Sequence, residues 1–300
     1  MKKVKNKRKK FYFKNWISPI KNITINFTFL LFVFIFLIFS YYLILNKPIN
    51  HNIFHINFDS EVTLTIKGNG SQKLFNNYNF KKPKNIYLNG NEMSISNSKY
   101  EYININGGEN NTIRIIWSQF YGNLGDAFRD LPNITEIDLS KLRVSITLMP
   151  NTFWSCTSLK SVNLSNLDIS KVTNMGHLFA DCTSLISVDL SNINTFKVTN
   201  IDNMFLNCFS LSSLNLSNFD TSSVTTVEYM FKNCTSLTSL NISNFKLPKI
   251  DSISNMFIDC KNLAYLDIYN IRLSQNDLQN IVNYTSTNLV LCVNNETIII

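Results

Sequence analysis

Five cysteines recur along this chain at a constant interval of 26 residues, and this period constrains the fold more than any other feature. A phenylalanine stands three positions before each cysteine and keeps the same period. A repeat of roughly 20 to 50 residues is typical of a solenoid, in which each unit packs only against its neighbours. The ten residues are Phe153, Phe179, Phe205, Phe231 and Phe257, and Cys156, Cys182, Cys208, Cys234 and Cys260.

Each unit reads F-x-x-C-x-x-L-x-x-L-x-L-x-N, and its two parts have different hydrophobic periods. The end of the leucine part alternates as a short strand does. In the segment before the cysteine, apolar residues follow at helical spacings, as in Val224, Val227, Phe231 and Cys234. We therefore expect an α/β solenoid in which every 26-residue coil contributes one short parallel strand and one short helix.

The repeated cysteines are best interpreted as a packing ladder, because equivalent positions in stacked coils form a column in the interior. A buried thiol behaves there as a small hydrophobe. Metal ligation requires close pairs such as C-x-x-C, which are absent, and a nucleophile requires one activated cysteine beside a base. Disulfides remain the alternative in an exported domain, although neighbouring side chains in a ladder run parallel.

The N-terminal part of the chain predicts a membrane anchor. Residues 23–45 are uncharged and mostly apolar, and as a helix they extend about 34 Å, enough to cross a hydrocarbon core of ~30 Å. Nine basic residues precede this segment, so the N-terminus is expected in the cytoplasm and the repeats outside the cell. A cleaved signal peptide is the alternative, but the exit lacks an A-x-A-like cleavage site.

These signals divide the chain into six predicted parts. They are a basic cytoplasmic tail (1–22), a transmembrane signal-anchor helix (23–45), a stalk (46–58), a small β N-terminal cap region (59–127), the solenoid (128–273) and a C-terminal cap (274–300).

The net charge of +8 does not indicate a nucleic-acid partner, because the positive charge is concentrated in the tail. Beyond residue 21 the chain carries 19 of its 28 basic side chains against all 20 acidic ones. A nearly neutral exported part has no basic face with which to neutralise phosphates. We therefore expect no nucleic acid among the partners.

The repeat motif resembles that of the BspA-type leucine-rich-repeat surface proteins. The segment "MFKNCTSLTSLNISNF" is similar to repeat arrays found on mycoplasma and protist surfaces, and the resemblance covers about residues 112–273. It implies a leucine-rich-repeat solenoid exposed at a cell surface, in a family generally assigned to adhesion or recognition. The unit at Phe128 lacks its cysteine and the unit after Phe257 diverges, which is consistent with capping coils.

Outward-facing strand positions form columns on the expected concave face, where solenoids present their ligands. Exposed tyrosines among small polar groups suit recognition. The alternative is a face that is merely solvated, and a calcium site is a weaker option because the carboxylates are spread over several coils. The candidate binding residues are Asp138, Asn163, Asp189, Asn215, Asn241, Tyr265, Asp267 and Tyr269.

The sequence contains no catalytic motif such as G-x-S-x-G or H-E-x-x-H, so we expect no enzyme activity, no catalytic residue, no cofactor and no metal site. The predicted function is a membrane-anchored surface module that binds a protein or glycan ligand in adhesion or recognition. A structural coat protein that self-associates is the main alternative. An intracellular scaffold is more distant, because it would require the opposite membrane topology.

Overall fold

The computed structural model describes residues 59–76, 80–96, 98–253, 255–293 and 296–299. The predicted tail (1–22), membrane anchor (23–45) and stalk (46–58) lie outside these residues. Within the described part of the chain, no helix is both long and apolar enough to span a bilayer.

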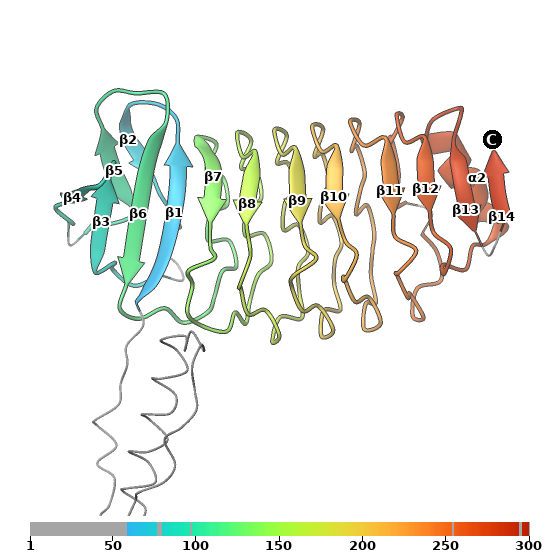
Figure 1. Ribbon diagram of the computed structural model, residues 1–300, viewed down its shortest axis with the longest axis horizontal. Helices are drawn as coiled ribbons and strands as arrows, with labels where there is room; N and C mark the ends of the chain where they lie inside the picture. Colours follow the sequence, from blue (N-terminus) through green and yellow to red (C-terminus); the bar gives the residue numbers. More distant parts are fainter. Residues whose placement is uncertain (1–58, 77–79, 97, 254, 294–295, 300) are drawn as a thin grey trace, which may run out of the picture. The chain divides into compact units, whose positions relative to one another are not determined.

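Short strands dominate the described residues (Figure 1). The strands before the repeats are β1 (Ser60–Ile66), β2 (Gly70–Lys73), β3 (Asn85–Leu88), β4 (Asn91–Met93), β5 (Tyr102–Ile105) and β6 (Asn111–Trp117). The repeats contribute β7 (Ile134–Asp138), β8 (Ser161–Asn163), β9 (Ser187–Asp189), β10 (Ser213–Asn215), β11 (Ser239–Asn241) and β12 (Tyr265–Asp267). Helix α2 (Gln275–Tyr284) and strands β13 (Val290–Val293) and β14 (Glu296–Ile299) follow.

The strands before the repeats form an antiparallel sheet that continues into the first coil. Alternate residues of β1 and β6 are buried, as their period of two requires. One edge of β1 pairs with β6 and the other pairs antiparallel with β7, giving the strand order β4-β3-β6-β1-β7-β8. The N-terminal sheet therefore covers the open end of the first coil.

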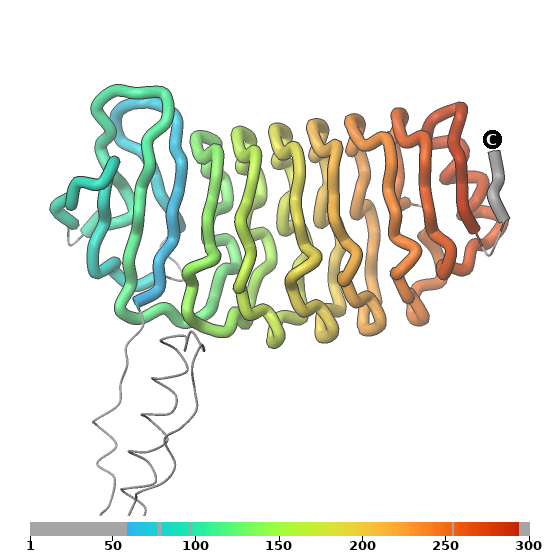
Figure 2. Tube along the Cα trace, viewed as in Figure 1, coloured from blue at the N-terminus to red at the C-terminus, as the bar shows by residue number. Residues whose placement is uncertain are grey.

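From β8 to β12, successive strands begin 26 residues apart and lie in one row (Figure 1). The tube trace shows one winding of the chain behind each strand (Figure 2). Neighbouring strands pair in parallel in β7–β8, β9–β10, β11–β12 and β12–β13. The predicted repeat solenoid is thus confirmed, in the form of a β-solenoid with little helix.

The phenylalanines of the repeat stack on one another through the interior. From Phe128 to Phe257, the centroids of neighbouring rings are 5.1 to 5.8 Å apart, and the ring planes differ by only 3° to 11°. The five repeat cysteines are fully buried beside this stack. Equivalent side chains of successive coils therefore share one continuous apolar core.

The predicted short helix in each coil is wrong, because the segment before each cysteine forms successive turns. Tyr229 and Asn233 have φ values of 55° and 62°, which interrupt a right-handed helix. The N–H groups of Phe231 and Asn233 donate to carbonyls of the following coil at Met256 and Ile258. The helical spacing of apolar residues therefore marks inward-facing positions in a chain of turns whose N–H groups alternately bond the next coil.

The C-terminal end adds a helix and a hairpin to the last coil. Strand β13 pairs in parallel with β12, and β14 pairs antiparallel with β13. Helix α2 begins with a capping box, in which Ser274 and Asp277 exchange side-chain and backbone hydrogen bonds. Asp277 is fully buried, so this helix start is anchored in the body of the solenoid.

Candidate functional site

The row of strands presents a polar outer face. In β9, Ser187 and Asp189 are exposed while Val188 between them is buried, and the other coils repeat this alternation. On this face Asn163, Asp189, Asn215 and Asn241 are exposed, and Asp138 and Asp267 are half-buried. Tyr265 and Tyr269 are 38% and 39% exposed. The structure thus places all eight candidate binding residues on or directly after the strands.

The Asp/Asn column has a structural role that the sequence pattern did not reveal. Each of its side chains accepts a hydrogen bond at Oδ1 from the backbone N–H two residues later, with N···O distances of 2.9 to 3.2 Å. These bonds form Asx turns that end the strands. Hydrogen bonds from Ser191 accordingly hold the pKa of Asp189 below its ordinary value. Only the second polar atom of each side chain remains for a ligand.

Strand pairing is interrupted in the middle of the face, between β10 and β11. The N–H of Leu190 donates to Asn215, and that of Ile242 donates to Asp267. The equivalent N–H of Leu216 bonds no described residue. A hollow of about 280 Å³ opens at this break, and we call it the strand-face hollow. It is lined by Leu214, Asn215, Leu216, Ser217, Asn241, Ser243 and Asn244.

The strand-face hollow is polar and uncharged, and two of the candidate residues, Asn215 and Asn241, contribute to it. Their amide NH₂ groups donate to no other described residue. Asn244 is the exception, because its Nδ2 donates to the carbonyls of Leu216 and Phe219 at 2.9 and 3.2 Å. The hollow therefore combines free amide donors with serine hydroxyls on a frame held by Asn244.

Sequence reasoning missed Ser217, Ser243 and Asn244 as parts of this site. The available signal was the Ser-Asn pair that follows each strand, as in Ser217-Asn218 and Ser243-Asn244. Its abundance in every repeat concealed the one place where it lines a hollow. The interruption of strand pairing depends on backbone hydrogen bonds, which the repeat pattern does not distinguish.

Tyr265 lies one strand beyond this hollow, since it pairs with Ser239 of β11. Its hydroxyl contacts the thiol of Cys292 at 3.7 Å, and this contact raises the pKa of Tyr265. Tyr269 follows in the turn after β12, where its N–H donates to Asp267. Both rings thus add apolar surface beside a polar hollow, as recognition surfaces require.

The ladder cysteines are free thiols, and they lie away from the strand face in the core. Burial raises the pKa of Cys156 and Cys260 to about 12, and raises that of the three cysteines between them as well. A thiol that stays protonated is a poor nucleophile and a poor metal ligand. Among the described residues, no group of three or more His, Cys, Asp or Glu side chains could hold a metal ion.

Comparisons with known proteins connect the repeats to a family. The family model described as "Mycoplasma protein of unknown function, DUF285" matches residues 122–214 and, in a second overlapping match, residues 186–288. The two matches together cover more than half of the chain. No curated protein sequence and no solved structure matches the chain.

Proposed function

The chain belongs to the family described as "Mycoplasma protein of unknown function, DUF285", and we propose that it is a recognition module on the outer surface of the cell. In this proposal residues 23–45 anchor the protein in the membrane and the solenoid carries the binding face. The resemblance of the repeat motif to BspA-type leucine-rich-repeat surface proteins supports a role in adhesion or recognition.

The observation that carries the proposal is the strand-face hollow with its neighbouring tyrosine. The hollow offers amide and hydroxyl groups of Asn215, Ser217, Asn241 and Ser243 and no charged side chain. Such groups match the hydroxyl-rich surface of a glycan, and Tyr265 on the next strand provides a flat apolar surface. A glycan is therefore the favoured ligand, and a protein ligand is the other outcome of the test.

The test is a glycan and host-protein binding screen with the full chain, followed by Asn241→Asp and Asn215→Asp. Both substitutions keep the Oδ1 acceptor of the Asx turn and remove only the NH₂ donor, as the natural Asp189 and Asp267 do elsewhere in the column. Asn163→Asp is the matched control, because Asn163 caps the same kind of turn outside the hollow. We expect at least tenfold weaker binding in the two variants and none of that loss in the control.

Equal binding by all three variants would remove the strand-face hollow as the ligand site. Self-association of the full chain, without any glycan or protein ligand, would favour the coat-protein alternative. The topology has its own test, in which intact cells are treated with protease. Digestion of the repeats supports an extracellular solenoid, and protection of the repeats would reverse the proposed orientation.

A further inference from the structure

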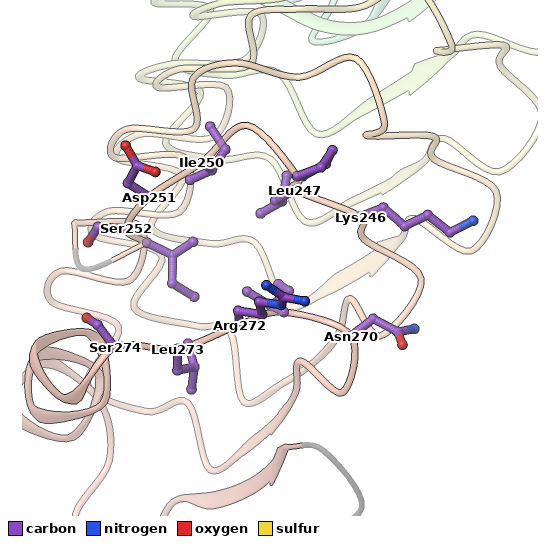
Figure 3. Close-up of a pocket in the computed structure, with 12 residues that line it drawn as sticks. Lys246, Leu247, Ile250, Asp251, Ser252, Asn270, Arg272, Leu273 and Ser274 are labelled. Atoms are coloured by element: carbon purple, nitrogen blue, oxygen red, sulfur yellow. The ribbon is translucent and has the colours of Figure 1, made fainter.

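A second cleft, separate from the strand face, opens between two loops near the C-terminal end of the coils (Figure 3). One wall comes from residues 246–253, which follow β11, and the other comes from residues 270–274, which follow β12 and lead into α2. Its volume is about 760 Å³. Small-molecule sites in proteins typically have roughly 300 to 1,000 Å³, so this cleft has room for an organic ligand.

The cleft exists because a connection between coils is lost at this position. In the preceding pair of coils, Oγ1 of Thr221 accepts from the N–H of Lys246 at 2.8 Å and donates to its carbonyl at 3.0 Å. We call this pair of bonds the threonine bridge, and Thr195 makes it one coil earlier. Leu247 occupies the equivalent position in the next coil and has no hydroxyl. The N–H of Arg272, which a bridge would have bound, makes no hydrogen bond to a described residue.

A backbone connection is also missing between the two walls. In earlier coils the N–H of Thr225 donates to Thr199, and that of Thr199 donates to Thr173. Across the cleft the equivalent donor is the N–H of Asp277, which donates instead to Oγ of Ser274 at the start of α2. No bond of this series therefore draws the two walls together.

The inner end of the cleft is nevertheless held firmly by the carboxylate of Asp277. One oxygen accepts from Ser252 Oγ at 2.5 Å and from the Ile253 N–H at 2.9 Å. The other accepts from Oγ and N–H of Ser274 at 2.6 and 2.9 Å. These bonds join both walls and occupy the donors at the helix start, so an anion in the cleft would have to bind elsewhere.

Two cations on neighbouring coils provide that place. Lys246 and Arg272 are exposed, and neither forms an ion pair with a described residue. Figure 3 shows Arg272 in the opening between the loops, with Lys246 and Asn270 on the same side and Asp251 at the opposite end. The guanidinium, the ammonium and the free N–H of Arg272 form a set of donors at one end of the cleft.

We propose that this cleft binds a small organic carboxylate with an apolar chain. The carboxylate would lie against the guanidinium of Arg272, whose planar fork suits bidentate binding of such a group. The chain would lie along the apolar side chains Leu247, Ile250 and Leu273, which line the cleft and are only partly covered by the core. This inference is independent of the proposed ligand of the strand face.

The test is a calorimetric titration of the full chain in lipid nanodiscs with sodium octanoate, with empty nanodiscs as the blank. We expect a dissociation constant of about 1 mM or tighter. Octan-1-ol, which lacks the charge, and butanoate, which lacks most of the chain, should each bind at least tenfold more weakly. Arg272→Gln should weaken octanoate binding at least tenfold, while the exposed Arg143→Gln should leave it unchanged.

Each opposite result would overturn the inference. No octanoate binding by the native chain, or equal binding by Arg272→Gln, would show that the cleft is not a carboxylate site. Octan-1-ol binding as tightly as octanoate would show that the two cations have no part in it. The ligand comparison needs no substitution, so it remains decisive even if a variant fails to fold.

Discussion

The thiol of Cys208 donates a hydrogen bond to the backbone carbonyl of Phe179, one coil earlier, over a distance of 3.1 Å. The other four ladder cysteines make the same bond to the phenylalanine of the preceding coil, at 2.9 to 3.2 Å. The repeated cysteine is therefore both a small apolar filler and the donor that satisfies an interior carbonyl.

This dual role predicts a difference between two substitutions of Cys208. Cys208→Ala leaves the Phe179 carbonyl without its donor and creates a small cavity, which should lower the free energy of unfolding by about 2 kcal/mol. Cys208→Ser keeps a donor and should cost about half as much. Urea denaturation measures both, with Cys292→Ala as the control. A larger loss in the serine variant would show that the apolar character of the thiol matters more than its hydrogen bond.

Thiol reactivity should separate the ladder from Cys292, the only half-buried cysteine of the six. Because alkylating reagents attack the thiolate, the five buried cysteines with raised pKa should remain unmodified at pH 8. Mass spectrometry after iodoacetamide treatment should find one modified cysteine in the folded protein and six in denaturant. Rapid labelling of Cys208 in the native state would contradict the buried ladder.

The same pKa shifts predict a loss of stability in alkali. In the unfolded chain a thiol ionises near its ordinary pKa of 9, whereas Cys156 and Cys260 in the fold ionise at about 12. The stability that these thiols contribute is therefore complete below pH 9 and declines as the pH rises from 9 towards 12. Denaturation curves across this range should show a weaker pH dependence in Cys156→Ala than in the native chain. Identical slopes would exclude the thiols as the cause.

Asp277 should hold α2 against the preceding coil. Burial raises its pKa, but the hydrogen bonds from Ser252, Ser274 and Ile253 outweigh this effect, and the pKa lies below the ordinary 3.8. Asp277→Asn should therefore reduce the free energy of unfolding by about 2 to 3 kcal/mol at pH 7, and the exposed Asp251→Asn should not.

The pH dependence provides a second readout for Asp277. A carboxylate with a lowered pKa contributes its full stability above pH 3.8, and this contribution is lost as the pH falls through the pKa of the folded state. The difference between native protein and Asp277→Asn should thus shrink below pH 4. A constant difference down to pH 2 would indicate that the variant acts through packing alone.

Thr221→Val tests the threonine bridge without changing side-chain volume much. The side chain is 1% exposed and makes both bonds to Lys246, so its loss leaves a buried N–H and a carbonyl without their partner. We expect a loss of about 2 kcal/mol in urea denaturation. Thr238→Val, whose exposed hydroxyl bonds no described residue, is the control. A neutral Thr221→Val would mean that the bridge does not hold the loops together.

The spacing of Phe205, Cys208 and their equivalents was enough to predict the stacked coils and the inward direction of these side chains. It could not exclude a helix before each cysteine, because the same spacing is satisfied by turns with positive φ at Tyr229 and Asn233. Which of the two forms depends on whether the N–H groups bond within the coil or to the next one. That choice is a tertiary effect, and the local pattern does not contain it.

The polar face was predictable as a column but not as a site. The sequence shows Asn215 and Asn241 as equal members of a series, and their Asx turns confirm that all members share one backbone role. Only the missing strand pair between β10 and β11 distinguishes them. The cleft at Arg272 likewise depends on one departure from the repeat, the leucine at position 247, whose consequence appears only when coils are stacked.

The bonds that join each coil to the next also govern how such a chain can change in length. A segment of 26 residues inserted between two coils would restore every donor, acceptor and ring contact at both junctions, whereas any other length would displace them. Gene duplication in whole repeats could thus extend the outer face without a new core. Natural variants of different size should accordingly differ by multiples of this unit.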